Sequence, residues 1–491
     1  TVVPDQYPDI SVNTFQDSTL ATLLYFAGEA SDDYGLLSLS FNYQIIRASG
    51  QATEAVSIKL DNPSSKAVQY EYAFDLTELI LEPGDEVNYY FEVFDNDQVN
   101  GSKSSKTGLM RFAKPSLEEY KAQAEENDDQ IKSELEDALK ESAKIQQDLK
   151  KMREKMLQQK NLDWQDKKAL ENMLERQKEI QEQIEEAKEA FEENLENQQE
   201  FSEMDEDILE KQEQLQELFE ELMSEEMQAL MKQIEEMMQE LEKDQALDMM
   251  ENMEMNDAEM EKELDRMLEL FKQLELEQEM KEMLSDLDQL SKDQEDLSKE
   301  TIKSNNDPEN APSQEELQEK QESINEQFEK MQQKMEDIQK KNQDMENPQK
   351  MEDYKQQMED IKQDLDLSKQ ELEKNQNDKA AKSQKNAAKE MKKMAESMES
   401  NMQAGQMEQL QLDMEALRQL LENLVGLSFD QEDLITALDE TNINTPAYTK
   451  LVQDQFKLRD DFRLVEDSLQ ALSKRVFQIE SFVTGKVTDI N

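Results

Sequence analysis

The sequence predicts a mainly α-helical protein with an N-terminal all-β domain, in which an immunoglobulin-like sandwich is followed by long antiparallel coiled-coil helices. Six of the nine glycines and five of the nine prolines lie within residues 1–115, which concentrates turn-forming residues at one end of the chain. Apolar residues alternate with polar ones in that stretch, and beyond it they recur every three or four positions. We therefore divide the chain into a sandwich over 1–115, an acidic Met/Gln-rich coiled-coil region over 116–425 with a break near 303–313, and a C-terminal helical segment over 426–491.

The first 115 residues have the pattern of short strands separated by turns. In residues 37–45 every second residue is apolar, which places one face of a strand on a core. Residues 70–74 and 87–93 repeat the alternation, and the second of these follows the turn sequence Pro83-Gly84-Asp85. Short strands with turns between them over about 100 residues are typical of an immunoglobulin-like sandwich. The chain lacks the cysteine pair of antibody domains.

A long helical region is predicted from Ser116 onward. Ser116 and Glu119 have the spacing of a capping box, in which each side chain satisfies a backbone N–H at the start of a helix. Apolar residues then follow steps of three and four, the spacing of a coiled-coil seam. Such seams cover residues 180–191, 223–241, 260–274, 276–290, 324–345 and 407–424. Because the seams change phase, we expect helices that fold back, with breaks near residues 161–163, 244–257, 304–313, 346–349 and 404–405, and a new helix opening at Ser428 and Gln431.

The composition excludes several kinds of chemistry. The chain has 55 Lys+Arg and 117 Asp+Glu, a formal net charge of −62, and neither cysteine nor histidine. Disulfides, thiolate nucleophiles, His-based relays and Cys- or His-ligated metals are therefore ruled out. We expect a protein that is not an enzyme and has no cofactor. A surface this acidic repels phosphates, so we expect no nucleic-acid partner and no peripheral membrane binding.

Four aspartates at one end of the predicted sandwich are a candidate calcium site. Asp32, Asp33, Asp95 and Asp97 offer hard oxygen ligands, of which Ca²⁺ takes six to eight. Their spacing is not that of an EF-hand, and aspartates in turns commonly accept hydrogen bonds from their own backbone. Turn formation is the favoured interpretation, and calcium is the alternative.

Methionine is concentrated in the middle of the chain, where 13 of the 29 methionines lie between Met223 and Met283. Its flexible thioether suits the binding of varied apolar partners. Most of these methionines occupy seam positions, which favours ordinary helix packing. Met249, Met250, Met253 and Met255 do not fit one seam, and they are the candidate partner-binding residues.

Several motifs of the N-terminal region resemble a known family. They are Ser31–Gly35, Pro83–Asp85, Tyr89–Asp97, Asn100-Gly101 and the entry at Pro115-Ser116 into a Met/Gln/Glu-rich region. Together they resemble a family of large uncharacterised envelope proteins of Bacteroidota, defined by a domain of unknown function. The resemblance implies membrane helices toward the N-terminus, β-sandwich repeats and then a long coiled-coil region. It further implies a periplasmic location, with a tether to the inner membrane only through segments outside this chain.

These patterns favour a non-catalytic periplasmic scaffold or spacer. We expect it to bind other cell-envelope proteins through long helical faces, either as a monomer or as a homo-oligomer. The alternative is a holdase-type chaperone, or an accessory factor of a secretion or outer-membrane assembly machine, that holds clients on Met-rich helices. The exposure of Met249, Met250, Met253 and Met255 is the observation that separates the two functions.

Overall fold

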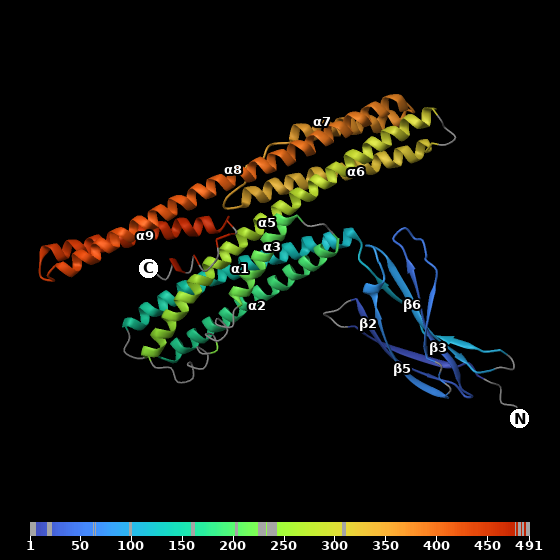
Figure 1. The fold of residues 1–491 in the computed structure, drawn as a ribbon, viewed down its shortest axis with the longest axis horizontal. Coiled ribbons are helices and arrows are strands. Elements are labelled where there is room, and N and C mark those ends of the chain that lie inside the picture. Colours follow the sequence, from blue (N-terminus) through green and yellow to red (C-terminus); the bar gives the residue numbers. More distant parts are fainter. Residues whose placement is uncertain are drawn as a thin grey trace. The chain divides into compact units, whose positions relative to one another are not determined.

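The computed structural model is 71% helical, with antiparallel strands in the first part of the chain and long helices in the rest (Figure 1). It describes residues 6–16, 22–61, 63, 65–97, 101–158, 163–201, 205–223, 232, 243–306, 311–476, 478–479, 483 and 486–487. The chain forms two compact units, Thr1–Glu126 and Asn127–Asn491. The predicted order, an all-β domain followed by helices, is confirmed.

Two antiparallel sheets form the β-sandwich of the first unit. One sheet has the order β1-β2-β5 and comprises β1 (Asp9–Gln16), β2 (Leu23–Ser31) and β5 (Ala67–Asp75). The other has the order β4-β3-β6-β7 and comprises β4 (Val56–Asp61), β3 (Leu36–Ile46), β6 (Glu86–Asp95) and β7 (Ser104–Lys106), with β8 (Met110–Ala113) also pairing with β6. A 3₁₀ turn, η1 (Leu76–Glu78), follows β5.

Aromatic side chains from both sheets fill the space between them. Phe26 of β2 lies edge-on to Phe91 of β6, with ring centroids 5.2 Å apart, and Phe41 of β3 lies 4.7 Å from Phe74 of β5. The predicted inward faces of β5 and β6 are therefore correct. The predicted inward position of Leu37 is wrong: the register shifts between Leu36 and Ser38, so Leu36 is buried and Leu37 is exposed.

Gly28 of β2 gives the Tyr70 ring room to cross the sheet. The Tyr70 hydroxyl donates to the Ser11 carbonyl at 2.9 Å, and burial raises the pKa of this tyrosine to about 12. A Cβ at residue 28 would lie 2.2 Å from the Ser11 carbonyl oxygen and 2.5 Å from the Tyr70 ring.

We therefore expect Gly28→Ala to lower the free energy of unfolding of the sandwich by about 1–3 kcal/mol, because backbone and ring must both move. Chemical denaturation followed by tyrosine fluorescence measures this. Gly108→Ala is the matched control, because a Cβ there meets no atom within 4 Å. Equal stabilities for the two variants would contradict the role of Gly28.

Eight long helices are described after the sandwich. They are α1 (Leu117–Gln158), α2 (Trp164–Phe201), α3 (Glu206–Leu222), α5 (Lys243–Asn306), α6 (Gln314–Asp344), α7 (Lys355–Glu373), α8 (Asn377–Glu440) and α9 (Pro446–Ser473). The predicted capping box precedes α1: Glu119 N–H donates to Ser116 Oγ at 3.2 Å, and Ser116 N–H donates to Glu119 Oε2 at 2.8 Å. Ser313 and Glu316 form an equivalent box before α6.

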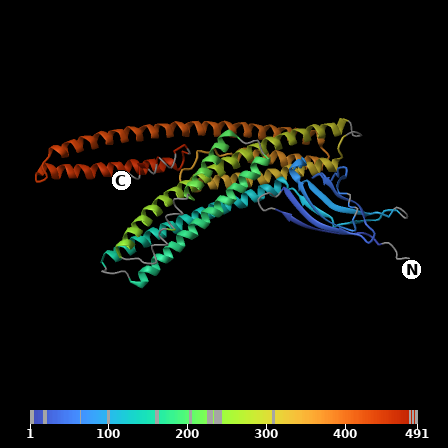
Figure 2. The same ribbon diagram turned by 60° about the horizontal axis from the view of Figure 1, so that its bottom comes forward.

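Two 64-residue helices, α5 and α8, are each shared between consecutive modules of the second unit (Figures 1 and 2). The first half of α5 packs with α1, α2 and α3 around one apolar core, the first bundle. Its second half packs with α6, α7 and the first part of α8 around another, the second bundle. The second part of α8 packs against α9 and the residues that follow α9. At about 1.5 Å per residue each shared helix is roughly 95 Å long.

Three predicted helix breaks coincide with helix ends, and two do not. Helices end or begin near residues 161–163, 304–313 and 346–349. The breaks predicted at 244–257 and 404–405 are wrong, because α5 and α8 run straight through them, and α8 also passes Ser428. A change of seam phase does not stop a helix when new neighbours cover the new face, and a helical glycine such as Gly405 costs only about 1 kcal/mol. Most of the seam predicted over 223–241 lies outside the described residues.

Candidate functional site

Two of the four candidate aspartates, Asp32 and Asp95, accept hydrogen bonds from backbone N–H groups of their own turns. Asp32 Oδ2 accepts hydrogen bonds from the N–H groups of Tyr34 at 2.9 Å and Gly35 at 2.7 Å. Asp95 is buried, and its Oδ1 accepts from the N–H groups of Asp97 at 3.2 Å and Lys103 at 2.8 Å. The two turns meet where Asn96 N–H donates to the Gly35 carbonyl at 3.0 Å.

A lysine ammonium lies beside the Asp95 carboxylate. Lys103 Nζ is 3.8 Å from Asp95 Oδ2, the oxygen of that carboxylate that makes no hydrogen bond. Within the described ranges, no group of three or more acidic, His or Cys side chains is placed to hold a metal ion. The observed hydrogen bonds are those of turn formation, the favoured interpretation of Asp32 and Asp95.

The four candidate methionines lie on α5, and three of them are buried. Met249, Met250 and Met253 are at most 2% exposed and belong to the core of the first bundle. Met255 is 69% exposed. The exposure that the holdase alternative requires is therefore found at Met255 alone. The other three fit no single seam because α5 has neighbours on more than one side, so more than one of its faces is covered.

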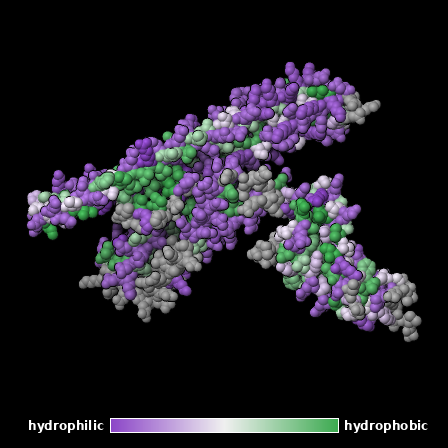
Figure 3. Space-filling view, in the orientation of Figure 1, coloured by the Kyte–Doolittle hydropathy of each residue, from purple (hydrophilic) through white to green (hydrophobic). Residues whose placement is uncertain are grey.

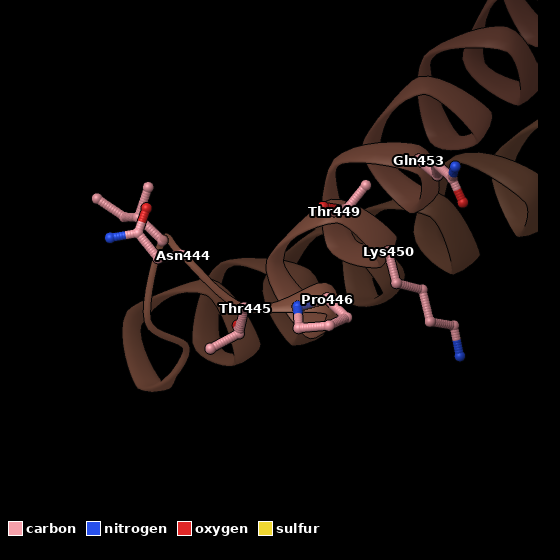
Figure 4. Close-up of a pocket in the computed structure, with 7 residues that line it drawn as sticks. Asn444, Thr445, Pro446, Thr449, Lys450 and Gln453 are labelled. Atoms are coloured by element: carbon pink, nitrogen blue, oxygen red, sulfur yellow. The ribbon is translucent and has the colours of Figure 1, made fainter.

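A depression of about 610 Å³ lies at the turn between α8 and α9 (Figure 4). Thr445 caps the start of α9 there, and Pro446 occupies its first turn. The labelled side chains lie along the connecting turn and the first turns of α9, and they do not converge on a common point. The lining residues are Ile443, Asn444, Thr445, Pro446, Thr449, Lys450 and Gln453, a set without a carboxylate or a nucleophile activated by a base.

Lysines from three helices converge on acidic residues of α5 where this helix passes from the first bundle to the second. Glu275 is 5% exposed, and its Oε1 lies 2.8 Å from Lys132 Nζ of α1 and 2.7 Å from Lys341 Nζ of α6. Lys341 also lies 2.6 Å from Glu279, and Lys211 of α3 pairs with the buried Glu277. We call these six residues the α5 junction.

The electrostatics of the α5 junction link the two bundles. Burial alone would lower the pKa of Lys341, but its bonds to Glu275 and Glu279 outweigh burial and raise that pKa. Burial, and next the charge of Glu275, raise the pKa of Asp128 on α1 to about 7. A slip of α3 along α5 would leave the buried Glu277 without its lysine, which costs several kcal/mol. A slip of α1 or α6 would remove one of the two lysines that pair with Glu275. The junction therefore favours one axial register of α1, α3 and α6 on α5.

A buried arginine connects α5 to the end of α9. Arg266 is 2% exposed; its Nε donates to the carbonyl of Ser473, the last residue of α9, at 3.3 Å, and its Nη2 donates to the carbonyl of Ile479. Lys474 pairs with Asp265 of α5 at 2.6 Å. Cations are favoured at the C-terminal end of a helix, where carbonyl groups lack partners. Nothing in the local sequence pattern indicates this contact.

The second part of α8 carries an exposed apolar stripe. Six side chains, each more than half exposed, make up what we call the α8 stripe: Met407, Leu410, Met414, Leu421, Val425 and Phe429. Figure 3 shows apolar surface gathered on the part of the molecule formed by α8 and α9, whereas the surface of the bundles is mostly hydrophilic. The sequence predicts a seam over 407–424, but a seam does not reveal whether a neighbour covers it.

None of the helices in the described part of the chain combines the length and apolarity needed to cross a membrane. No protein-family model, curated protein or solved structure matches the chain.

Proposed function

We propose that the chain is a non-catalytic scaffold or spacer of the bacterial cell envelope that holds other envelope proteins along its helical unit. The observation that carries the proposal is the sharing of α5 and α8 between consecutive modules. A helix that continues from one core into the next fixes the spacing of the two modules along its length of roughly 95 Å, because a continuous helix bends only gently. The α5 junction also supports a scaffold or spacer, because it favours one register between the bundles.

The proposed mechanism is binding on extended faces. The outward sides of the helices carry Glu, Gln, Lys and Asp, and many are linked by ion pairs between neighbouring turns, such as Lys140 with Asp137 and Lys393 with Glu390. Exposed pairs of this kind contribute little stability, about 0–1 kcal/mol each, but keep a long helix soluble. The envelope location and the tether to the inner membrane through other segments belong to this proposal, and rest on the resemblance of the N-terminal motifs.

The holdase function has weaker support. A holdase of this kind would need a surface of flexible methionines, but Met249, Met250 and Met253 lie in the core of the first bundle. Met255 is exposed but single, and scattered apolar side chains are normal on protein surfaces.

Site-specific photocrosslinking in the native envelope tests the scaffold. A photoreactive amino acid at the exposed Leu157 of α1 samples the first bundle, and one at the exposed Leu367 of α7 samples the second. We expect each position to capture the same few folded envelope proteins in repeated experiments. A chain that carries the photoreactive amino acid at both positions should be crosslinked to a protein from each set in one complex. The buried Leu135 is the matched control and should capture none. Capture of many unrelated proteins, increasing with heat shock, would instead indicate a holdase.

A further inference from the structure

The second part of α8 has two apolar faces, and α9 covers one of them. Leu420 is buried in the core that contains Val465 and Leu469 of α9. At about 100° per residue, the α8 stripe spans roughly 100° of the helix circumference and is centred about a third of a turn away from Leu420. Its six side chains are 54–63% exposed. The stripe is therefore a second face, separate from the contact with α9.

The α8 stripe has the spacing of a coiled-coil seam. Its members follow one another by steps of three, four, seven, four and four residues. Steps of three and four also separate Met331, Met335 and Ile338 of α6, which are covered by other helices of the second bundle. Apolar seams of this kind stabilise a helix when another helix covers them.

We propose that a second copy of this chain covers the α8 stripe, with the two α8 helices antiparallel around a two-fold axis. In this alignment Leu410 of each copy faces Val425 of the other, and Met414 faces Leu421. A two-fold interface uses the same patch on both copies, so the patch must be complementary to itself. The near-symmetrical spacing of the stripe about its centre satisfies this condition. The pairing does not depend on the proposed scaffold function.

Charge favours this part of the chain over others for contact between copies. The net charge of −62 opposes close approach elsewhere, but residues 403–429 contain only Glu408, Asp413, Glu415 and Glu422 against Arg418. Arg418 and Glu415 are both exposed. In the antiparallel alignment, Arg418 of each copy lies about 3 Å along the axis from the level of Glu415 of the other, which permits two symmetrical ion pairs.

The area of the stripe fits a weak, specific dimer. Six side chains that each lose on the order of 100 Å² would bury about 600 Å² per copy, or about 1,200 Å² in total. This is near the lower end of the range for specific interfaces. We therefore expect dissociation constants in the micromolar range, and tighter pairing at higher salt because salt screens the repulsion between copies.

Sedimentation equilibrium of the full chain from about 1 to about 100 µM tests the pairing. We expect a monomer–dimer equilibrium, and a dimer weakened at least about tenfold by Leu421→Glu. The matched control is Leu412→Glu, because Leu412 is equally exposed on α8 but lies off the stripe. A wild-type chain that stays monomeric at every concentration, as it would if the stripe instead bound another protein, overturns the proposal. So does a dimer that Leu421→Glu leaves intact.

Cysteine crosslinking tests the orientation, since the chain has no cysteine of its own. The single variants Leu410→Cys and Val425→Cys should each remain uncrosslinked after mild oxidation, and their mixture should form a disulfide-linked dimer. A parallel pairing would crosslink each variant with itself, and that result would overturn the antiparallel arrangement. Circular dichroism of each variant confirms that the fold is retained.

Discussion

Replacing Arg266 by methionine is expected to release the end of α9 from α5. The substitution removes the donors that Ser473 and Ile479 use and leaves two carbonyl groups buried without partners. Each unsatisfied buried carbonyl costs about 1–3 kcal/mol, so for two of them we expect a local loss of about 2–6 kcal/mol. Because α9 is at the edge of the helical unit, the loss should appear as local opening and leave the bundles folded.

Hydrogen exchange measures this opening. Amides of residues 465–473 should exchange at least about thirtyfold faster in Arg266→Met, while those of α6 keep their rates. Arg266→Lys should give an intermediate result, because an ammonium group lacks the planar fork of a guanidinium. The matched control is Arg459→Met, on an α9 arginine whose side chain is half exposed and pairs with Asp460. Unchanged exchange in α9 of Arg266→Met would refute the anchoring role.

The features that the sequence predicts correctly are those fixed by near neighbours. The capping box at Ser116 depends on residues within one helical turn, and the break near residues 304–313 lies at two prolines, Pro308 and Pro312. The alternation that buries Val87–Val93 is equally local. The period of an apolar pattern therefore determines the type of each element, and caps and prolines determine several of its ends.

The features that the sequence misses depend on distant neighbours. Arg266 and Ser473 are 207 positions apart, and no spacing rule connects them. Met249, Met250 and Met253 look unsuited to a single seam because the pattern does not show that α5 is covered from several sides. The helix α5 continues through residues 244–257 for the same reason, because neighbouring helices cover it on several sides. A phase change indicates a change of neighbours, and the neighbours are set by the tertiary fold.

Asp257 presents a buried carboxyl group inside the first bundle. Ser142 of α1 donates a hydrogen bond to its Oδ1 at 3.1 Å. Its Oδ2 and the Oε1 of Gln177 on α2 are both buried oxygens without a hydrogen-bond partner. Burial, supported by the nearby charge of Glu261, raises the pKa of Asp257 from 3.8 to about 7.

The raised pKa makes the stability of the first bundle depend on pH. Below about pH 4 the carboxyl is neutral in both the folded and the unfolded chain, so its ionisation costs nothing. Between about pH 4 and 7 the unfolded chain has lost the proton while the folded chain keeps it, so stability falls as pH rises. Above about pH 7 the carboxyl is ionised in both states, and burying its charge lowers the free energy of unfolding by on the order of 4 kcal/mol, at 1.36 kcal/mol per pKa unit.

Replacing Asp257 by asparagine should remove this cost, since the amide is neutral at every pH and keeps the acceptor for Ser142. We expect the free energy of unfolding to rise by about 2 kcal/mol at pH 5.5 and by about 4 kcal/mol at pH 8. Urea denaturation followed by circular dichroism measures the difference, and both conditions avoid the isoelectric point near 4.3. Asp248→Asn, at an exposed position of the same helix, is the matched control and should change stability by less than about 0.5 kcal/mol. A gain for Asp257→Asn that is the same at both pH values would show that the wild-type carboxyl does not titrate between them, because only a group that changes charge there makes the difference grow with pH.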